Sequence, residues 1–148
     1  MTADLITDAP RLRTILEQAR TIAVLGASTQ PSRAGFYVPN YLREQGYRII
    51  PVNPLHHRLR EWGEPFRRAL AEIAEPVDIV DVFRHPGFLP GHLDDILAMQ
   101  PRPATVWLQS GIRHDEFANQ LIAAGICVVQ DRCTLADHRA FGLGPRRT

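Results

Sequence analysis

The stretch TIAVLGASTQPSRAG, residues 21–35, joins a short apolar run to a segment with helical character. The run ends at Gly26, and small and polar residues follow until about Ala34. Phosphate-binding turns begin in this way, because the free backbone amides at the start of a helix attract anions. Only Gly26 stands where a dinucleotide-binding fingerprint has three glycines. The stretch alone therefore leaves two interpretations open, a phosphate site and an ordinary polar turn.

Short apolar runs and longer helical stretches alternate along the rest of the chain. The apolar runs, rich in Val and Ile, cover residues 22–26, 47–52, 77–83, 104–109 and 125–130. Helices are predicted at about 34–45, 65–73, 88–99 and 114–124, with Gly46 and Gly125 at helix ends, and an amphipathic helix is predicted after Asp8 and Pro10. Strands that alternate with helices form a parallel sheet with right-handed crossovers. We therefore predict an α/β fold, a doubly wound, five-stranded parallel sheet with helices on both faces.

The composition is typical of a soluble globular protein with a single domain. The chain has 148 residues, of which 45% are hydrophobic and 22% are charged, and its net charge of +1 gives no reason to expect nucleic acid binding. No apolar run approaches the length of a membrane span, and the first residues lack the pattern of a signal peptide, so we expect a cytoplasmic protein without membrane contact. We divide the chain into an N-terminal helix within residues 1–20, a ligand-binding domain over 21–140 and a flexible tail over 141–148.

The two cysteines, one tryptophan and two aspartates are expected to have structural roles. Cys127 and Cys133 match neither a redox motif nor a zinc motif, and we expect free thiols, with Cys127 buried in a strand and Cys133 more accessible in a loop. Trp107 is expected to be a core side chain. Asp81 and Asp131 are expected to cap turns or to pair with nearby arginines.

The ligand of a doubly wound sheet binds beyond the carboxyl ends of the strands, at the point where the strand order reverses. The loop after the first predicted strand therefore carries the first candidate site. Its backbone at Gly26 and Ala27 would offer amides to an anion. The hydroxyl groups of Ser28 and Thr29 and the guanidinium of Arg33 would add further donors.

The loop after the second predicted strand carries a basic cluster. A nicotinamide-adenine site has an acidic residue here for the ribose hydroxyls, whereas this chain has Asn53, followed by Pro54, His56, His57 and Arg58. These basic residues would attract a phosphate on the adenosine ribose. Coenzyme A, with its 3′-phosphate, and NADP, with its 2′-phosphate, both fit, and a basic surface turn is the other interpretation. A metal site is disfavoured because no carboxylate or cysteine stands nearby to complete the ligand set of the adjacent histidines.

Polar residues also follow the third and fourth predicted strands. Arg84 and His85 precede a Pro-Gly turn that could face the adenine and the phosphates. After the fourth strand, Gln109 is followed by Ser110 and Gly111, and we expect the Ser110 hydroxyl and the Gly111 amide to be free donors.

Five motifs in chain order carry a resemblance to a known family. They are IAVLGAST, IIPVNP, VDIVDVFR, VWLQSG and VVQDRC, one for each predicted strand. Together, over roughly residues 15 to 135, they resemble the small stand-alone CoA-binding domain proteins, which are related to the nucleotide-binding domain of the succinyl-CoA synthetase α-subunit. The resemblance implies a Rossmann-like sheet that holds coenzyme A across the carboxyl ends of its strands.

The resemblance also implies a place for each part of the nucleotide. It puts the pyrophosphate near Gly26, Ser28, Thr29 and Arg33, the 3′-phosphoadenosine near Asn53, Pro54 and the basic residues from His56, the adenine side near Phe83 and Arg84, and the pantetheine side near Gln109, Ser110 and Gly111. The chain departs from the family pattern at His56, where the synthetase subunit has a lysine. Neutral imidazole is a weaker partner for an anion than ammonium is.

These observations favour a binding module for coenzyme A or a short acyl-CoA, without a catalytic domain. An NADP-binding oxidoreductase component and an acyl-CoA ligase subunit-like protein are the alternatives. The chain has no segment for a substrate domain and no counterpart of the synthetase domain that carries a phosphorylated histidine, so we do not expect an enzyme. A structural subunit that has lost its ligand is a third possibility, and a protein partner or a homodimer is left open.

Overall fold

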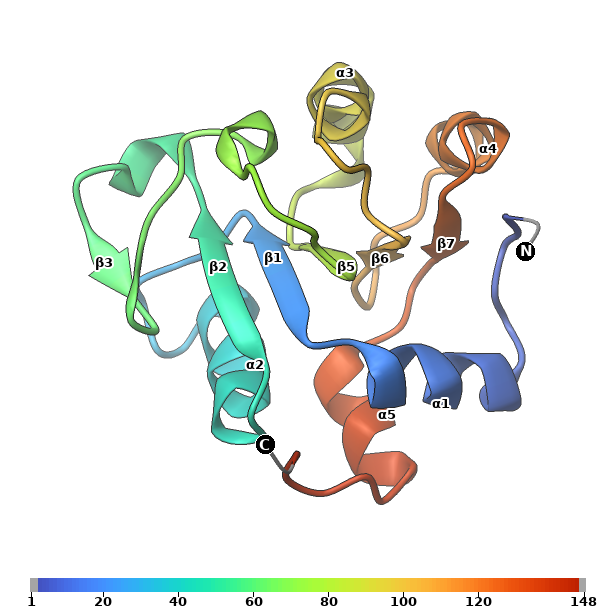
Figure 1. Cartoon of the computed structure of the whole chain (residues 1–148), viewed down its shortest axis with the longest axis horizontal. Helices are drawn as coiled ribbons and strands as arrows, with labels where there is room; N and C mark the ends of the chain where they lie inside the picture. The colour runs from blue at the N-terminus through green and yellow to red at the C-terminus, as the bar shows by residue number, and fades with distance from the viewer. Residues whose placement is uncertain (1–2, 147–148) are drawn as a thin grey trace.

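The apolar runs form one five-stranded parallel sheet in the structure, a computed structural model that describes residues 3–146 (Figure 1). The strands are β1 (Thr21–Leu25), β2 (Arg48–Val52), β5 (Ile79–Val82), β6 (Thr105–Leu108) and β7 (Cys127–Val129). Their order is β2-β1-β5-β6-β7, with β2 on one side of β1 and the later strands on the other, so the strand order reverses between β1 and β5. All five predicted strands and the Rossmann-like, doubly wound fold are confirmed.

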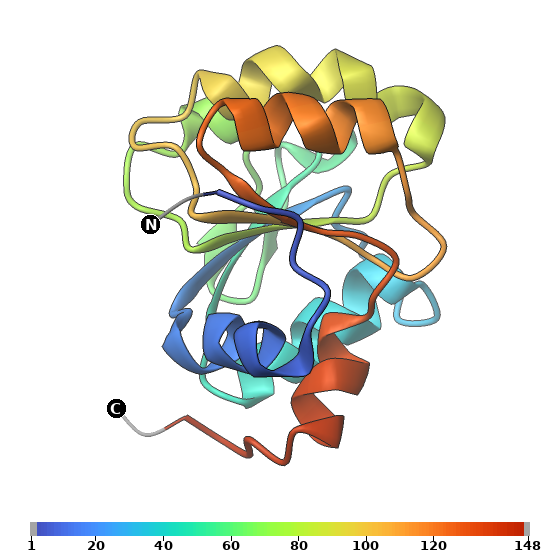
Figure 2. The same cartoon turned by 90° about the vertical axis from the view of Figure 1, so that its right-hand side faces the viewer.

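Helices cover both faces of this sheet (Figure 2). One face carries α1 (Ala9–Gln18), α2 (Ala34–Glu44) and α5 (Thr134–Ala140), and the other carries α3 (Leu93–Leu97), α4 (Asp115–Ala123) and a 3₁₀ turn at Pro86–His92. Each face buries its own apolar cluster, one containing Leu16 and Trp107 and the other containing Val80 and Phe117. The expectation that Trp107 is a core side chain is confirmed, because it is fully buried.

The crossover from β2 to β5 contains no α-helix, so the prediction of a helix at 65–73 is wrong. The chain forms a small hairpin of β3 (Arg60–Glu61) and β4 (Glu64–Pro65) and then a 3₁₀ turn at Leu70–Glu72. Trp62 and Gly63 both have positive φ, which gives the tight turn of a two-residue hairpin. Beyond the hairpin, the Arg67 amide donates to the Pro51 carbonyl, so this segment runs extended along the edge of β2.

The predicted helix at 88–99 is confirmed only in part. Its α-helical portion is α3, Leu93–Leu97, and the preceding residues form the 3₁₀ turn. Pro90 lies inside that turn and has no amide hydrogen for an α-helical hydrogen bond.

The first described residues run along the edge of the sheet at β7, where the Ile6 amide donates to the Val128 carbonyl, whereas the last ones pack on the face that carries α1. The Asp8 carboxylate accepts a hydrogen bond from the Arg11 amide at the start of α1, as the capping pattern predicts. The last two residues of the predicted tail, 147–148, lie outside the described residues. Before them, the Arg146 amide donates to the Gln45 carbonyl at 2.7 Å, and the Arg13 guanidinium donates to the Phe141 carbonyl at 2.8 Å. The tail therefore contacts α1 and the end of α2.

Two glycines let the turn after β1 lie directly against the end of β5. Gly26 has a φ of +85°, and a Cβ atom at this position would lie 2.6 Å from the Phe83 carbonyl oxygen. A Cβ atom at Gly35, the second residue of α2, would lie 2.8 Å from the Gly26 carbonyl oxygen. Neither position has room for a side chain, so both glycines are required by the close approach of three segments.

A fully buried carboxyl group, that of Asp81, lies within the sheet on β5. The side-chain amide nitrogen of Gln109, just after β6, and the hydroxyl of Thr134, at the start of α5, both donate to it. Burial raises the pKa of Asp81 to about 7, and these two hydrogen bonds oppose the rise. The expectation that Asp81 caps a turn or pairs with an arginine is wrong, because its partners are the side-chain amide of Gln109 and the hydroxyl group of Thr134.

Replacing Gly35 by alanine should destabilise the protein, although alanine favours helices by about 1 kcal/mol over glycine. The new methyl group would press on the Gly26 carbonyl oxygen. We expect the free energy of unfolding to fall by roughly 1–3 kcal/mol, the usual cost of overpacking. Gly91→Ala is the matched control, since a Cβ atom there meets nothing within 4 Å. Urea unfolding of both variants measures the difference, and equal stabilities would contradict the close approach.

Replacing Asp81 by asparagine should change how stability depends on pH. Between about pH 4 and pH 7, folded Asp81 keeps a proton that the unfolded chain has lost, so the free energy of unfolding of the wild type falls as pH rises. Asp81→Asn removes this contribution, and the variant should gain stability relative to the wild type from about pH 5 to about pH 8. Denaturant unfolding at both pH values measures this change. A difference that stays constant would show that the carboxyl group titrates equally in both states.

Candidate functional site

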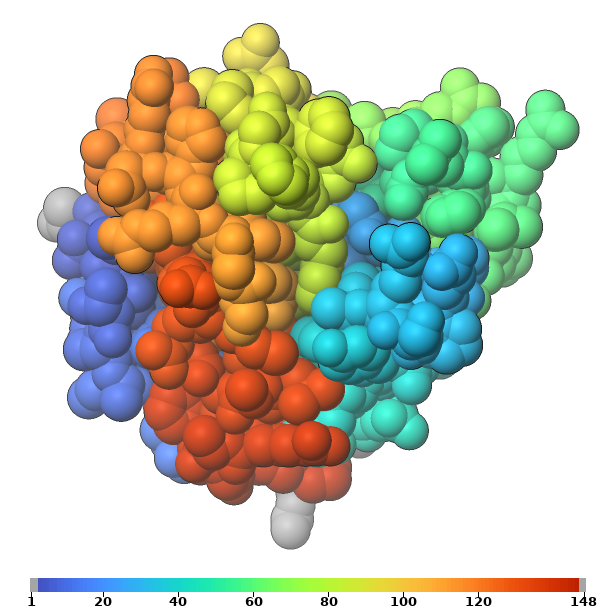
Figure 3. All heavy atoms as spheres, turned by 180° about the vertical axis from the view of Figure 1, so that it is seen from behind, coloured from blue at the N-terminus to red at the C-terminus, as the bar shows by residue number. Residues whose placement is uncertain are grey.

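A cleft of about 440 Å³ lies where the strand order reverses, beyond the carboxyl ends of β1, β5 and β6. Its lining comes from three loops: Gly26, Ser28, Arg33, Ala34 and Gly35 after β1; Phe83, Arg84, His85 and Pro86 after β5; and Gln109, Ser110, Gly111 and Ile112 after β6. Figure 3 shows this side of the molecule, where the loop after β1 (light blue), the turn after β5 (yellow-green) and the loop after β6 (orange) gather. The structure thus brings predicted residues from three separate loops into one cleft.

Backbone hydrogen bonds hold the turn after β1 in place. The expectation that the amides of Gly26 and Ala27 are offered to an anion is wrong, because both donate to the Val52 carbonyl, at 3.0 and 3.3 Å. The side-chain amide of Asn53 donates to the Ala27 carbonyl at 2.9 Å. Ala27 is fully buried, and neither Ala27 nor Asn53 lines the cleft. Asn53 therefore supports the turn from behind.

Donors for an anion gather at the start of α2. Arg33 is the residue before the helix, and its side chain does not cap it, so the first amides of the helix remain for another acceptor. Arg33 Nε donates to the Gln30 side chain at 3.0 Å, and the Ser28 hydroxyl accepts from the Gln30 amide at 3.0 Å. These contacts order the loop and hold Arg33 beside Ala34 and Gly35, at the positive end of the helix dipole.

Arg84 presents a buried donor at the cleft. Its Nε is buried and has no hydrogen-bond partner among residues 3–146. Its guanidinium lies over the ring of Phe88, 4.5 Å from the ring centre. A buried N–H without an acceptor costs free energy, so this position favours a ligand that brings an acceptor.

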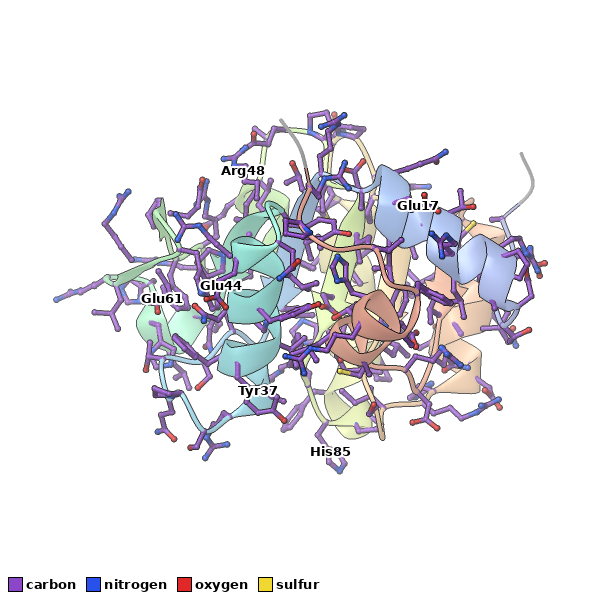
Figure 4. All side chains as sticks on the ribbon, turned by 90° about the horizontal axis from the view of Figure 1, so that it is seen from below. Glu17, Tyr37, Glu44, Arg48, Glu61 and His85 are labelled. Atoms are coloured by element: carbon purple, nitrogen blue, oxygen red, sulfur yellow. The ribbon has the colours of Figure 1, made fainter. Side chains whose placement is uncertain are left out.

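His85 lies at the outer part of the same edge. Its Nδ1 accepts a hydrogen bond from the Gly87 amide at 3.0 Å, which leaves Nε2 to face a ligand. Figure 4 shows the His85 side chain at the same edge as Tyr37 of α2, whereas Arg48, at the start of β2, lies at the opposite edge. His85, a lining residue, thus lies at the carboxyl end of the sheet, away from the start of β2.

The loop after β6 forms the remaining wall. The expectation of a free Gly111 amide is wrong, because this amide donates to the Asp131 carboxylate at 2.6 Å. Asp131 therefore closes a turn and does not pair with an arginine. Ser110 is exposed, Gln109 is only 4% exposed, and Ile112 adds an apolar surface.

The basic residues after β2 lie at the same edge of the sheet but do not line the cleft. The His56 ring packs against Phe66 with 5.4 Å between ring centres, and His57 Nδ1 lies 3.0 Å from the Pro54 carbonyl oxygen. Arg58 is exposed. β1 lies between β2 and the other strands that border the cleft, β5 and β6. These residues could therefore contact only a part of a ligand that extends past the turn after β1.

The structure also shows which lining residues the sequence did not point to, namely Ala34, Gly35 and Ile112. The sequence could have indicated Gly35, because a second glycine at the start of a helix often marks a close approach of two backbone segments. Among the predicted residues, Ala27, Thr29, Asn53, Pro54 and the basic residues lie outside the lining.

Both cysteines are free thiols, as predicted, but the expectation that the strand buries Cys127 is wrong. Cys127 is half-buried like Cys133, because it is the first residue of β7, at the open amino end of the strand. Within residues 3–146, no group of three or more His, Cys, Asp and Glu side chains could hold a metal ion. The helices of this part of the chain are all too short or too polar to span a membrane.

Comparisons with known proteins agree with the fold. The CoA binding domain family matches residues 20–139. The uncharacterized protein YneT of Bacillus subtilis (strain 168) is 34% identical over 127 residues, which are 86% of this chain and 91% of YneT. A solved structure from Thermus thermophilus is 52% identical, with a TM-score of 0.86, and covers 90% of this chain and 98% of that chain.

A hypothetical protein from Pyrococcus horikoshii OT3 is 27% identical, with a TM-score of 0.82 over 90% of this chain and 92% of that chain. The family match covers most of the chain and includes all five strands of the sheet. The resemblance drawn from the strand motifs is thereby confirmed, and the chain belongs to the CoA binding domain family.

Proposed function

We propose that the protein binds coenzyme A, or a short acyl-CoA, across the carboxyl ends of β1, β5 and β6. The observation that carries this proposal is the buried, unpartnered Nε of Arg84 beside a cleft that also receives the first amides of α2. A pyrophosphate would supply acceptors to both. Membership of the CoA binding domain family supports CoA-related binding.

The proposed ligand runs along the edge of the sheet from β2 to β6. The pyrophosphate lies over the turn after β1, near Gly26, Ser28, Thr29 and Arg33, with the adenine side near Phe83 and Arg84. The 3′-phosphate reaches past this turn to the basic cluster at His56, His57 and Arg58, behind Asn53 and Pro54. The pantetheine arm follows the loop after β6, near Gln109, Ser110 and Gly111.

We infer a binding role, since the residues that line the cleft come from the loops of one sheet. We place this role in the cytoplasm, where the CoA thiol and both free cysteines of the chain stay reduced. The proposal covers free CoA and a short acyl-CoA alike. A protein partner or a homodimer stays a prediction.

Removing the guanidinium of Arg33 should weaken CoA binding. Arg33→Ala is expected to cost about 1–3 kcal/mol of binding free energy, the range for a hydrogen bond to a charged group. Arg43→Ala is the matched control, because Arg43 is an exposed arginine in the last turn of the same helix and its loss changes the net charge equally. Isothermal titration calorimetry measures both affinities, and both ligand-free variants should melt near the wild type. Unchanged CoA affinity in Arg33→Ala would make Arg33 a surface residue only.

The basic cluster should distinguish CoA from dephospho-CoA, which lacks only the 3′-phosphate. Because Arg58 in this cluster carries a positive charge, CoA should bind more tightly than dephospho-CoA. NADP should bind less well than CoA, since it has no pantetheine arm. Calorimetric titrations with CoA, dephospho-CoA, NADP and NAD measure these preferences.

Replacement of His56, His57 and Arg58 by alanine should abolish the preference for CoA over dephospho-CoA. Equal affinities of the wild type for these two ligands would refute the role of the cluster. Tight binding of NADP or NAD alone would identify a nicotinamide protein instead.

A further inference from the structure

Gln109 lies between the buried carboxyl group of Asp81 and the cleft. Its Nε2 donates to Asp81 Oδ1 and, at 2.8 Å, to Thr134 Oγ1, so both amide hydrogens point into the protein. Its backbone is also engaged, since its amide donates to the Val82 carbonyl and its carbonyl accepts from the Ile112 amide. Gln109 nevertheless lines the cleft. The side-chain oxygen Oε1 is therefore the atom that Gln109 presents to a ligand.

The hydrogen bonds of the network fix this orientation of the amide. The Thr134 hydroxyl donates its hydrogen to Asp81 Oδ2 at 3.0 Å, so it can only accept from Gln109. An ionised Asp81 carboxylate also can only accept. Both neighbours of Gln109 thus require an N–H donor. With the amide turned over, Oε1 would face two acceptors inside the protein.

We propose that Asp81 is a positioning residue that holds the Gln109 amide with its oxygen toward the cleft, so that Gln109 accepts a hydrogen bond from an N–H group of the ligand. The secondary amides of the pantetheine arm carry such a group, whereas adenosine phosphates have none at this end. This assignment of the ligand group rests on the proposed function. It makes Gln109 a specificity determinant for the arm, and Asp81 acts only through Gln109.

Protonation of Asp81 would remove the constraint on the orientation of the Gln109 side-chain amide. A protonated carboxyl group donates a hydrogen bond, and Gln109 Oε1 could then turn inward and accept it, with the NH₂ group facing the cleft. Burial raises the pKa of Asp81 to about 7, so this exchange falls near neutral pH. The acceptor for pantetheine is thus present above this pH and lost below it.

Few other titratable groups face Asp81. The neighbouring strands β1 and β6 contain no ionisable residue. On α5, Asp137 is held by the Arg132 guanidinium with two hydrogen bonds of 2.8 Å, and burial lowers the pKa of His138, which disfavours its charged form. On α2, the Tyr41 hydroxyl bonds His138 Nδ1 at 2.8 Å. After β5, Arg84 faces the cleft.

Calorimetry with two ligands tests the role of Asp81. CoA carries the pantetheine arm, and adenosine 3′,5′-bisphosphate lacks it. At about pH 8, Asp81→Asn should lower CoA affinity roughly tenfold, as expected for one hydrogen bond, and leave the bisphosphate affinity unchanged. The ratio of the CoA affinity of the wild type to that of Asp81→Asn should fall between about pH 8 and about pH 6. Because both proteins bind the same ligand, the ionisation of the ligand cancels in this ratio. Equal effects on both ligands, or none, would overturn the proposal.

A double-mutant cycle separates positioning from a general structural role. Gln109→Met removes the acceptor at nearly constant length, and adding Asp81→Asn to it should cause no further loss of CoA affinity. A full additional loss would show that Asp81 acts independently of Gln109, which would contradict the proposal.

Nuclear magnetic resonance of the ligand-free wild type gives a readout that does not depend on CoA. The side-chain amide hydrogens of Gln109 should be protected from solvent exchange at about pH 8 and lose this protection by about pH 6, as the Asp81 carboxyl carbon titrates. Unprotected hydrogens at the higher pH, or protection that does not change, would overturn the proposed orientation. If the wild type binds no CoA in calorimetry, the proposed function fails, and this measurement alone decides the role of Asp81.

Discussion

The contact between the turn after β1 and the end of β5 is the constraint on which the ligand edge depends. At Gly26 the two backbones lie too close for any side chain, and at Gly35 the start of α2 approaches the same turn equally closely. This contact brings the amino end of α2 over the point where the strand order reverses. It also sets Arg84, the residue after Phe83, against the same cleft. A single steric requirement thus gathers the groups that favour an anion.

A buried polar network adds a second constraint on the other wall of the cleft. Asp81 lies inside the sheet, and its cost of burial is offset by hydrogen bonds from Gln109 and Thr134. The same bonds join β5, β6 and α5, and they leave one oxygen of Gln109 for the cleft. One wall therefore offers donors to phosphate, and the other offers an acceptor. This polarity suits a ligand with an anionic end and an amide-bearing arm.

The sequence predicted the parts of this arrangement that depend on local pattern. Runs of Val and Ile gave all five strands, and Gly26, Arg33, Arg84 and Gln109 were expected at the strand ends where the cleft lies. Long-range contacts were not predictable. Apolar residues at 65–73 suggested a helix, but Arg67 pairs with the backbone of β2. The partner of Asp81 on α5 is 53 residues away along the chain, so no local pattern could reveal the network.

A crystal structure of the protein with CoA tests the central claim most directly. We predict the pyrophosphate between the first turn of α2 and Arg84, with a phosphate oxygen within hydrogen-bond distance of the Arg84 Nε that is buried without a partner in residues 3–146. The pantetheine arm should follow the loop after β6, past Gln109. CoA bound at another face, or an empty cleft at saturating CoA, would contradict the account.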